Sequence, residues 1–184
     1  MAYLNTLRST SWLSDVSEQK VSITAIELGS GCGIVGIGLA QMISNYDILL
    51  TDLPDAQSIL KQNVSCSSAA KGSAISACVL DWELDLPPEV SERKHDMILV
   101  SDCTYNTDTI PALVNTLSKL TLISPKAVTY LATKVRHDSE TEFFKLMNDA
   151  SFAARQLSAI TLPNLSSQYE GDYETVDIYE FRKG

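Results

Sequence analysis

The residues best suited to chemistry lie in a glycine-rich stretch at positions 26–38, which reads Ile-Glu-Leu-Gly-Ser-Gly-Cys-Gly-Ile-Val-Gly-Ile-Gly. A short apolar run leads into Gly29, Gly31 and Gly33, and a helical pattern follows. Glycine lacks a Cβ atom, so the backbone can turn tightly and approach a ligand closely just before the N-terminus of a helix. The pattern predicts a loop that binds a nucleotide cofactor.

The glycines alone leave two kinds of ligand open. Gly31-x-Gly-x-x-Gly36 also satisfies the dinucleotide fingerprint, so the loop suits a nicotinamide or flavin enzyme as well as one that uses S-adenosylmethionine (AdoMet). Glu27 favours AdoMet, because a carboxylate there would attract the cationic methionine end and repel a pyrophosphate. The alternative is that Glu27 only stabilises the N-terminus of the following helix.

More polar side chains follow the later apolar runs. Asp52 ends the second run, where a carboxylate can reach ribose hydroxyls, and Asp81 and Trp82 follow the third, where they could bind adenine. Asp102 and Tyr105 follow the fourth run. Ligands of open α/β sheets bind at the carboxyl ends of the strands, so these residues are expected to share one crevice.

Each of these residues also has an ordinary structural alternative. Asp52 could cap a helix, Trp82 could be a core aromatic, Asp102 could be a turn residue, and Tyr105 could serve packing alone. His95 and His137 adjoin charged or loop residues, and we expect both to be solvated.

Apolar runs and helical patterns alternate along the chain, which indicates a single α/β domain over residues 1–184. Strands are predicted near 23–28, 46–51, 74–80, 96–101, 127–133, 153–160 and 176–181, and helices near 34–43, 55–69, 109–120 and 140–150. The polar connection at 163–173 lacks helical periodicity. It predicts a hairpin that joins two antiparallel strands at the end of the chain.

Composition narrows the possible functions. The chain has 184 residues, of which 45% are hydrophobic, and no apolar run long enough to span a membrane. No targeting segment is recognisable, so we expect a soluble, cytoplasmic monomer. A net charge of −9 disfavours nucleic acid as a partner. The four cysteines are widely spaced, which predicts reduced thiols and no metal site.

Seven strands that end in a hairpin resemble the Rossmann-like class I methyltransferase fold, with a mostly parallel sheet and helices on both faces. The ordered motifs resemble family 16 of the seven-β-strand protein lysine methyltransferases, of the methyltransferase-like 21 type. The motifs are Glu27-Leu-Gly-Ser-Gly, Thr51-Asp52, the helix around Asn63, Asp81-Trp82, Asp96-Met-Ile-Leu, Asp102-x-x-Tyr105, Leu131-Ala-Thr-Lys-Val-Arg136 and Val176-Asp-Ile-Tyr-Glu180. Members mostly methylate lysines on chaperones, elongation factors and other defined proteins.

The resemblance implies a cofactor site and an acceptor site. AdoMet would contact Glu27, Gly29, Ser30, Gly31, Gly33, Asp52, Leu53, Asp81, Trp82 and Ser101, while the catalytic residues Asp102 and Tyr105 would face a protein lysine. Asp102 is expected to orient the incoming amine rather than to act as a base. Members normally carry a Trp-Asp element before the first strand, and Trp12 lies too close to Glu27 to take that role.

Three alternatives to a protein lysine methyltransferase remain. A nicotinamide-dependent oxidoreductase would need a proton donor, such as a Tyr-x-x-x-Lys pair or a histidine near the fourth strand, and neither is present. A non-catalytic interaction module could retain the fold, and a small-molecule amine could be the methyl acceptor.

Overall fold

The computed structural model describes residues 22–134, 138–163 and 173–184. Its strands form one sheet and are β1 (Ile23–Leu28), β2 (Tyr46–Asp52), β3 (Ala74–Val79), β4 (Met97–Ser101), β5 (Val128–Thr133), β6 (Phe152–Pro163) and β7 (Tyr173–Lys183). The first five begin and end within two residues of their predicted positions. This agreement follows from their runs of β-branched and aliphatic residues bounded by turns.

The strand order is β3-β2-β1-β4-β5-β7-β6. The β1–β2, β1–β4, β2–β3 and β4–β5 pairs are parallel, whereas β7 is antiparallel to both β5 and β6. The predicted C-terminal antiparallel pair is therefore confirmed, with a register shift between Gln156 and Ser158. Its strands are longer than predicted, and the connection at 164–172 lies outside the described residues.

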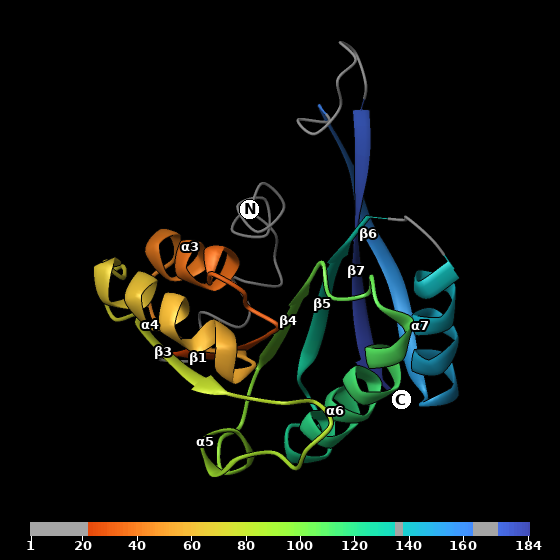
Figure 1. Ribbon diagram of the computed structural model, residues 1–184, viewed down its shortest axis with the longest axis horizontal. Coiled ribbons are helices and arrows are strands. Elements are labelled where there is room, and N and C mark those ends of the chain that lie inside the picture. The colour runs from red at the N-terminus through yellow and green to blue at the C-terminus, as the bar shows by residue number, and fades with distance from the viewer. Residues whose placement is uncertain (1–21, 135–137, 164–172) are drawn as a thin grey trace.

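The helices are α3 (Ile34–Met42), α4 (Gln57–Cys66), α5 (Pro88–Ser91), α6 (Ile110–Ile123) and α7 (Asp138–Asp149), with 3-10 turns η1 (Pro54–Ala56) and η2 (Thr107–Thr109). Four of them were expected from helical spacing, while the one-turn helix α5 is too short to show such spacing. In Figure 1, α3 and α4 lie on one side of the β1–β3 part of the sheet and α5 and α6 on the other.

Two buried clusters show why helices cover both faces. Ile26 and Leu28 of β1 pack with α6 and α7, whereas Ala25 packs with α3 and α4. Successive side chains of a strand point to opposite faces, so a central parallel strand must be apolar on both. This alternation places Glu27, between Ile26 and Leu28, on the α3 face of the sheet.

Candidate active site

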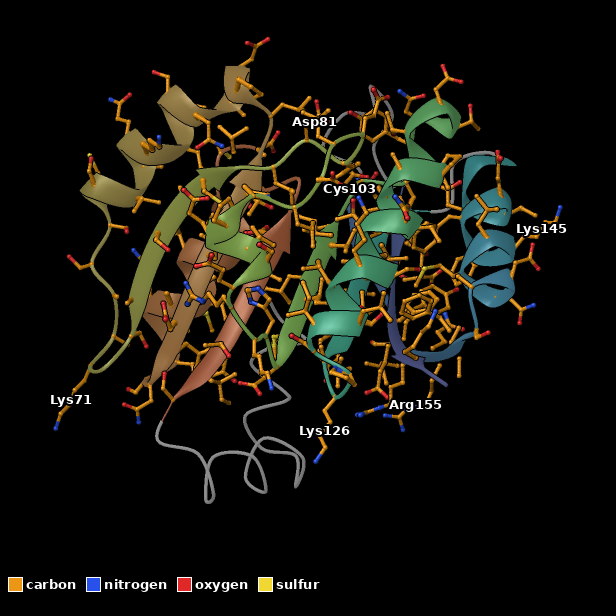
Figure 2. The ribbon with its side chains drawn as sticks, turned by 90° about the horizontal axis from the view of Figure 1, so that it is seen from below. Lys71, Asp81, Cys103, Lys126, Lys145 and Arg155 are labelled. Carbon is orange, nitrogen blue, oxygen red and sulfur yellow. The ribbon has the colours of Figure 1, made fainter. Side chains whose placement is uncertain are left out.

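A pocket of roughly 460 Å³ opens at the carboxyl ends of the parallel strands. Figure 2 shows Asp81 and Cys103 at this end of the sheet and Lys71 at the opposite end. The lining residues end or follow β1, β2, β3 and β4, or lie where η2 meets α6, and they are Gly29, Gly31, Asp52, Leu53, Leu80, Asp81, Trp82, Glu83, Asp102, Cys103, Tyr105, Thr109 and Ala112. This is the crevice in which open α/β sheets bind ligands.

The glycine loop, residues 29–33, has a backbone that L side chains rarely adopt. Gly29, Gly31 and Gly33 have φ of 62°, 55° and 84°. A Cβ at Gly31 would meet no atom within 4 Å, whereas one at Gly33 would lie 2.8 Å from Leu60 Cδ1. The backbone conformation thus favours glycine at all three positions, and at Gly31 the missing side chain also leaves the pocket open to a ligand.

Polar contacts hold the glycine loop from two neighbouring elements. The Asp52 carboxylate accepts hydrogen bonds from the amides of Gly31 at 2.6 Å and Leu53 at 2.7 Å. On the other side, Asn63 Nδ2 of α4 donates to the Cys32 carbonyl at 2.8 Å. These two hydrogen bonds from the backbone orient the Asp52 carboxylate. Each of its oxygens has a further lone pair, so it can still accept a hydrogen bond from a ligand on the pocket side.

Glu27 lies beneath the loop and does not line the pocket. Its side chain is 2% exposed, and Oε2 accepts a hydrogen bond from the Gly36 amide at 2.9 Å. Burial raises the pKa of this carboxyl to about 7, although the hydrogen bond from the Gly36 amide opposes the rise. The geometry supports the helix-stabilising role for Glu27, and its direct contact with a cofactor stays a prediction.

Ser30 also serves the loop itself. Its buried Oγ donates to the Glu27 carbonyl at 3.2 Å and accepts from the Thr51 amide at 3.1 Å, which joins the ends of β1 and β2. Gly33 packs against apolar side chains, and Ser101 is half-buried at the end of β4. Like Glu27, these three predicted cofactor residues lie next to the pocket without lining it.

Asp81 and Trp82 form the wall that follows β3. Asp81 Oδ1 accepts a hydrogen bond from the Glu83 amide at 3.0 Å, which fixes the turn. The six-membered ring of Trp82 lies beside the glycine loop, with Cζ2 3.2 Å from the place where a Cβ on Gly29 would stand. The indole is half-buried and packs against the core, so it contributes to the fold as well as to the pocket.

The segment after β4, residues 102–105, forms the wall opposite β2. Asp102 has φ 54°, its side chain is exposed, and it lines the pocket. Tyr105 is 66% exposed and lines the same pocket. Between them, Cys103 is buried, and burial raises the pKa of its thiol to about 12.

The structure therefore brings together eight of the twelve predicted site residues, namely Gly29, Gly31, Asp52, Leu53, Asp81, Trp82, Asp102 and Tyr105. Sequence reasoning missed Leu80, Glu83, Cys103, Thr109 and Ala112. Three of these adjoin predicted residues, so their position in the chain was a usable signal. Thr109, the last residue of η2, and Ala112, in the first turn of α6, reach the pocket only in the folded chain.

The charged residues that line the pocket are acidic. Asp52, Asp81, Glu83 and Asp102 line it, and no Lys, Arg or His does so within the part of the chain that the structure describes. Such a lining favours cations and disfavours phosphate groups. It therefore suits a sulfonium cofactor and an ammonium substrate better than a dinucleotide.

Within residues 22–134, 138–163 and 173–184, no group of His, Cys, Asp or Glu is arranged to hold a metal ion. None of the helices in these ranges has the length and apolar composition of a membrane span. Cys32, Cys66, Cys78 and Cys103 are all free thiols.

His95 was predicted to be solvated, but the structure buries it, and burial lowers its pKa to about 4. Trp12 and His137 lie outside the described residues.

Comparison with solved structures identifies the fold. The chain superposes on a SAM-dependent methyltransferase from Methanosarcina mazei with a TM-score of 0.64 and 12% identity, covering 90% of this chain and 95% of that one. The predicted Rossmann-like class I methyltransferase fold is therefore confirmed. SAM, the cofactor in the name of that relative, is AdoMet.

The family follows from the sequence match. Residues 1–150 match a family described as lysine methyltransferase, and the chain belongs to that family. It is 36% identical over 130 residues to EEF1A lysine methyltransferase 3 of Xenopus tropicalis and 38% identical over 124 residues to that of Mus musculus. These alignments cover 69% and 66% of this chain but 55% and 50% of the relatives, so the chain spans about half of their length.

Proposed function

We propose that this chain binds AdoMet in the pocket and transfers its methyl group to the amine of a lysine side chain in a protein. The observation that carries the proposal is the facing pair of Gly31 and Asp52. At Gly31 the backbone is open to the pocket, and beside it Asp52 presents a carboxylate that the glycine loop has already oriented. A pocket of roughly 460 Å³ is within the range of sites for small cofactors.

The lining residues divide between cofactor and acceptor. Asp52 would accept from the ribose hydroxyls, Asp81 from the adenine amino group, and Trp82 would pack against the adenine ring. When bound, AdoMet supplies an electrophilic methyl group on a sulfonium. The four carboxylates of the pocket complement that positive charge.

Asp102 and Tyr105 would receive the lysine. Methyl transfer is an in-line displacement, so the protein mainly aligns the amine and excludes water. The Asp102 carboxylate would orient the ammonium by a charge-assisted hydrogen bond. The same carboxylate raises the pKa of the amine, which opposes its deprotonation, so orientation is its first role. The exposed Tyr105 ring would form one wall of the acceptor channel.

The nature of the acceptor is inferred from family membership and from the acidic pocket. Relatives in this family are named for EEF1A, which supports an elongation factor as the substrate, with a chaperone as the alternative. We further propose that the protein acts as a monomer in the cytoplasm. Analytical ultracentrifugation and imaging of a tagged chain would test these two points.

The test is incubation of the purified chain with radiolabelled AdoMet and a cell extract, followed by mass spectrometry of the labelled proteins. Label on the ε-amine of a lysine is the expected result. Label on small amines alone would replace the protein substrate with a small-molecule one. AdoMet binding without any transfer, or no binding in calorimetry, would favour a non-catalytic interaction module.

A further inference from the structure

Residues 102–105 contact β5, the end of β1 and the glycine loop. The Asp102 amide donates to the Ala132 carbonyl of β5 at 2.9 Å, and Thr104 Oγ1 lies 2.8 Å from Thr133 Oγ1 of the same strand. Between these two anchors, the Cys103 side chain points the other way, toward β1 and the glycine loop.

The Cys103 thiol contacts three carbonyl oxygens. Its Sγ lies 3.2 Å from the oxygen of Ser101, 3.4 Å from that of Leu28 and 3.8 Å from that of Gly29. The thiol has one proton, so it donates to one of these acceptors at a time, and S–H donors are weak. The side chain is 6% exposed and uncharged, so it fills space between the two segments as well as donating.

Gly29 is shaped to receive this sulfur. A Cβ at Gly29 would lie 2.7 Å from Cys103 Sγ, closer than real Cβ contacts allow. The Gly29 backbone has φ 62°, which also favours glycine. The sulfur therefore occupies the space that the missing Cβ leaves, and the contact joins the loop after β1 to the segment that carries Asp102 and Tyr105.

We propose that Cys103 is a positioning residue that sets the distance between the glycine loop and residues 102–105, and thereby aligns the methyl acceptor with the cofactor. The inference rests on the proposed methyl transfer. Cys103 itself takes no part in the chemistry. It acts through Gly29 on the cofactor side and through Asp102 on the acceptor side.

Three substitutions at Cys103 test the role through AdoMet affinity and the rate of methyl incorporation into cell-extract protein at saturating AdoMet. Cys103→Val adds a branch against Gly29 and should weaken AdoMet binding at least about tenfold. Cys103→Ala leaves a gap and should lower the rate at least about fivefold while AdoMet affinity changes less than about threefold. Cys103→Ser keeps a donor and should lose less of the rate than Cys103→Ala.

The matched control is Cys66→Ala, which removes an exposed thiol from α4 and should change neither measurement. Wild-type rate and affinity in all three Cys103 variants would overturn the proposal. So would equal losses of rate and affinity that follow only the fraction of folded protein, since these would make Cys103 a plain core residue.

A double-mutant cycle between Gly29→Ala and Cys103→Ala tests the contact without any methyl transfer. Urea denaturation should show that Gly29→Ala destabilises the wild-type chain more than the Cys103→Ala chain, because the sulfur that a new Cβ would meet is absent there. Equal losses in both backgrounds would refute the contact. If the wild-type chain binds no AdoMet, the proposed function fails, and the cycle still decides whether Cys103 joins the two segments.

Discussion

The Glu27 carboxylate lies under the first turn of α3 and accepts a hydrogen bond from the Gly36 amide at 2.9 Å. The two residues are so close that a Cβ at Gly36 would stand 2.7 Å from Glu27 Oε2. The amide is one of the donors that a helix leaves unsatisfied at its N-terminus, and the acid satisfies it from inside the protein. Glu27 therefore fixes the helix that follows the glycine loop, and its ionisation is linked to stability.

We expect Glu27→Gln to change the pH dependence of stability. The folded pKa is raised from 4.5 to about 7, so between these values the folded state holds a proton that the unfolded state has lost. The contribution of Glu27 to the free energy of unfolding should thus fall as pH rises through this window, by about 3 kcal/mol. Glutamine resembles the protonated acid, so the variant should be more stable than wild type at pH 8 and about equally stable near pH 4.5.

Urea denaturation of both proteins from pH 4.5 to pH 8 measures this difference. His95 titrates in both proteins, so its contribution cancels in the comparison. A difference that is constant with pH would mean that the Glu27 carboxyl does not titrate in this window.

Asp52→Ala tests the ribose contact. The substitution removes the carboxylate that lines the pocket and bonds the Gly31 amide, so AdoMet binding should weaken by about 1–3 kcal/mol. Calorimetry measures the affinity. Asp55→Ala is the control, because Asp55 is an exposed acid three residues further on that does not line the pocket. Unchanged affinity for Asp52→Ala would remove the assignment.

Trp82 provides an optical test of the adenine site. Its ring lines the pocket beside Gly29, so AdoMet or its demethylated product should change the tryptophan fluorescence, and Trp82→Phe should lose most of that change. Phenylalanine retains an aromatic face, so binding itself should persist. A response kept in full by the variant would identify Trp12 as the reporter.

Much of this arrangement could be predicted from the sequence, because apolar runs and glycine turns are local signals. They placed Asp52, Asp81 and Asp102 at strand ends, and parallel strands bring such ends to one edge. The orientation of Glu27 was also encoded, since it alternates with Ile26 and Leu28 and must face α3. That alternation was the overlooked signal.

Other features have no local signal. His95 stands among charged residues in the chain, yet folding buries it beside Ser124, whose Oγ accepts from the His95 amide at 2.9 Å. Thr109 reaches the pocket only because α6 packs across the sheet. The fit of Cys103 against Gly29 joins residues 74 positions apart, so it depends on tertiary packing alone.

Asp102→Asn separates acceptor orientation from cofactor binding. Asp102 has φ 54°, a conformation that asparagine tolerates as well as aspartate does, so the backbone should be kept while the charge is lost. Methyl incorporation into extract protein should fall at least about tenfold, equivalent to about 1.4 kcal/mol, while AdoMet affinity stays within about threefold. Asp108→Asn, an exposed acid in the same connection, is the control and should leave the rate unchanged. Equal losses of binding and rate would assign Asp102 to the cofactor site or to the fold, and a wild-type rate would show that it does not orient the lysine.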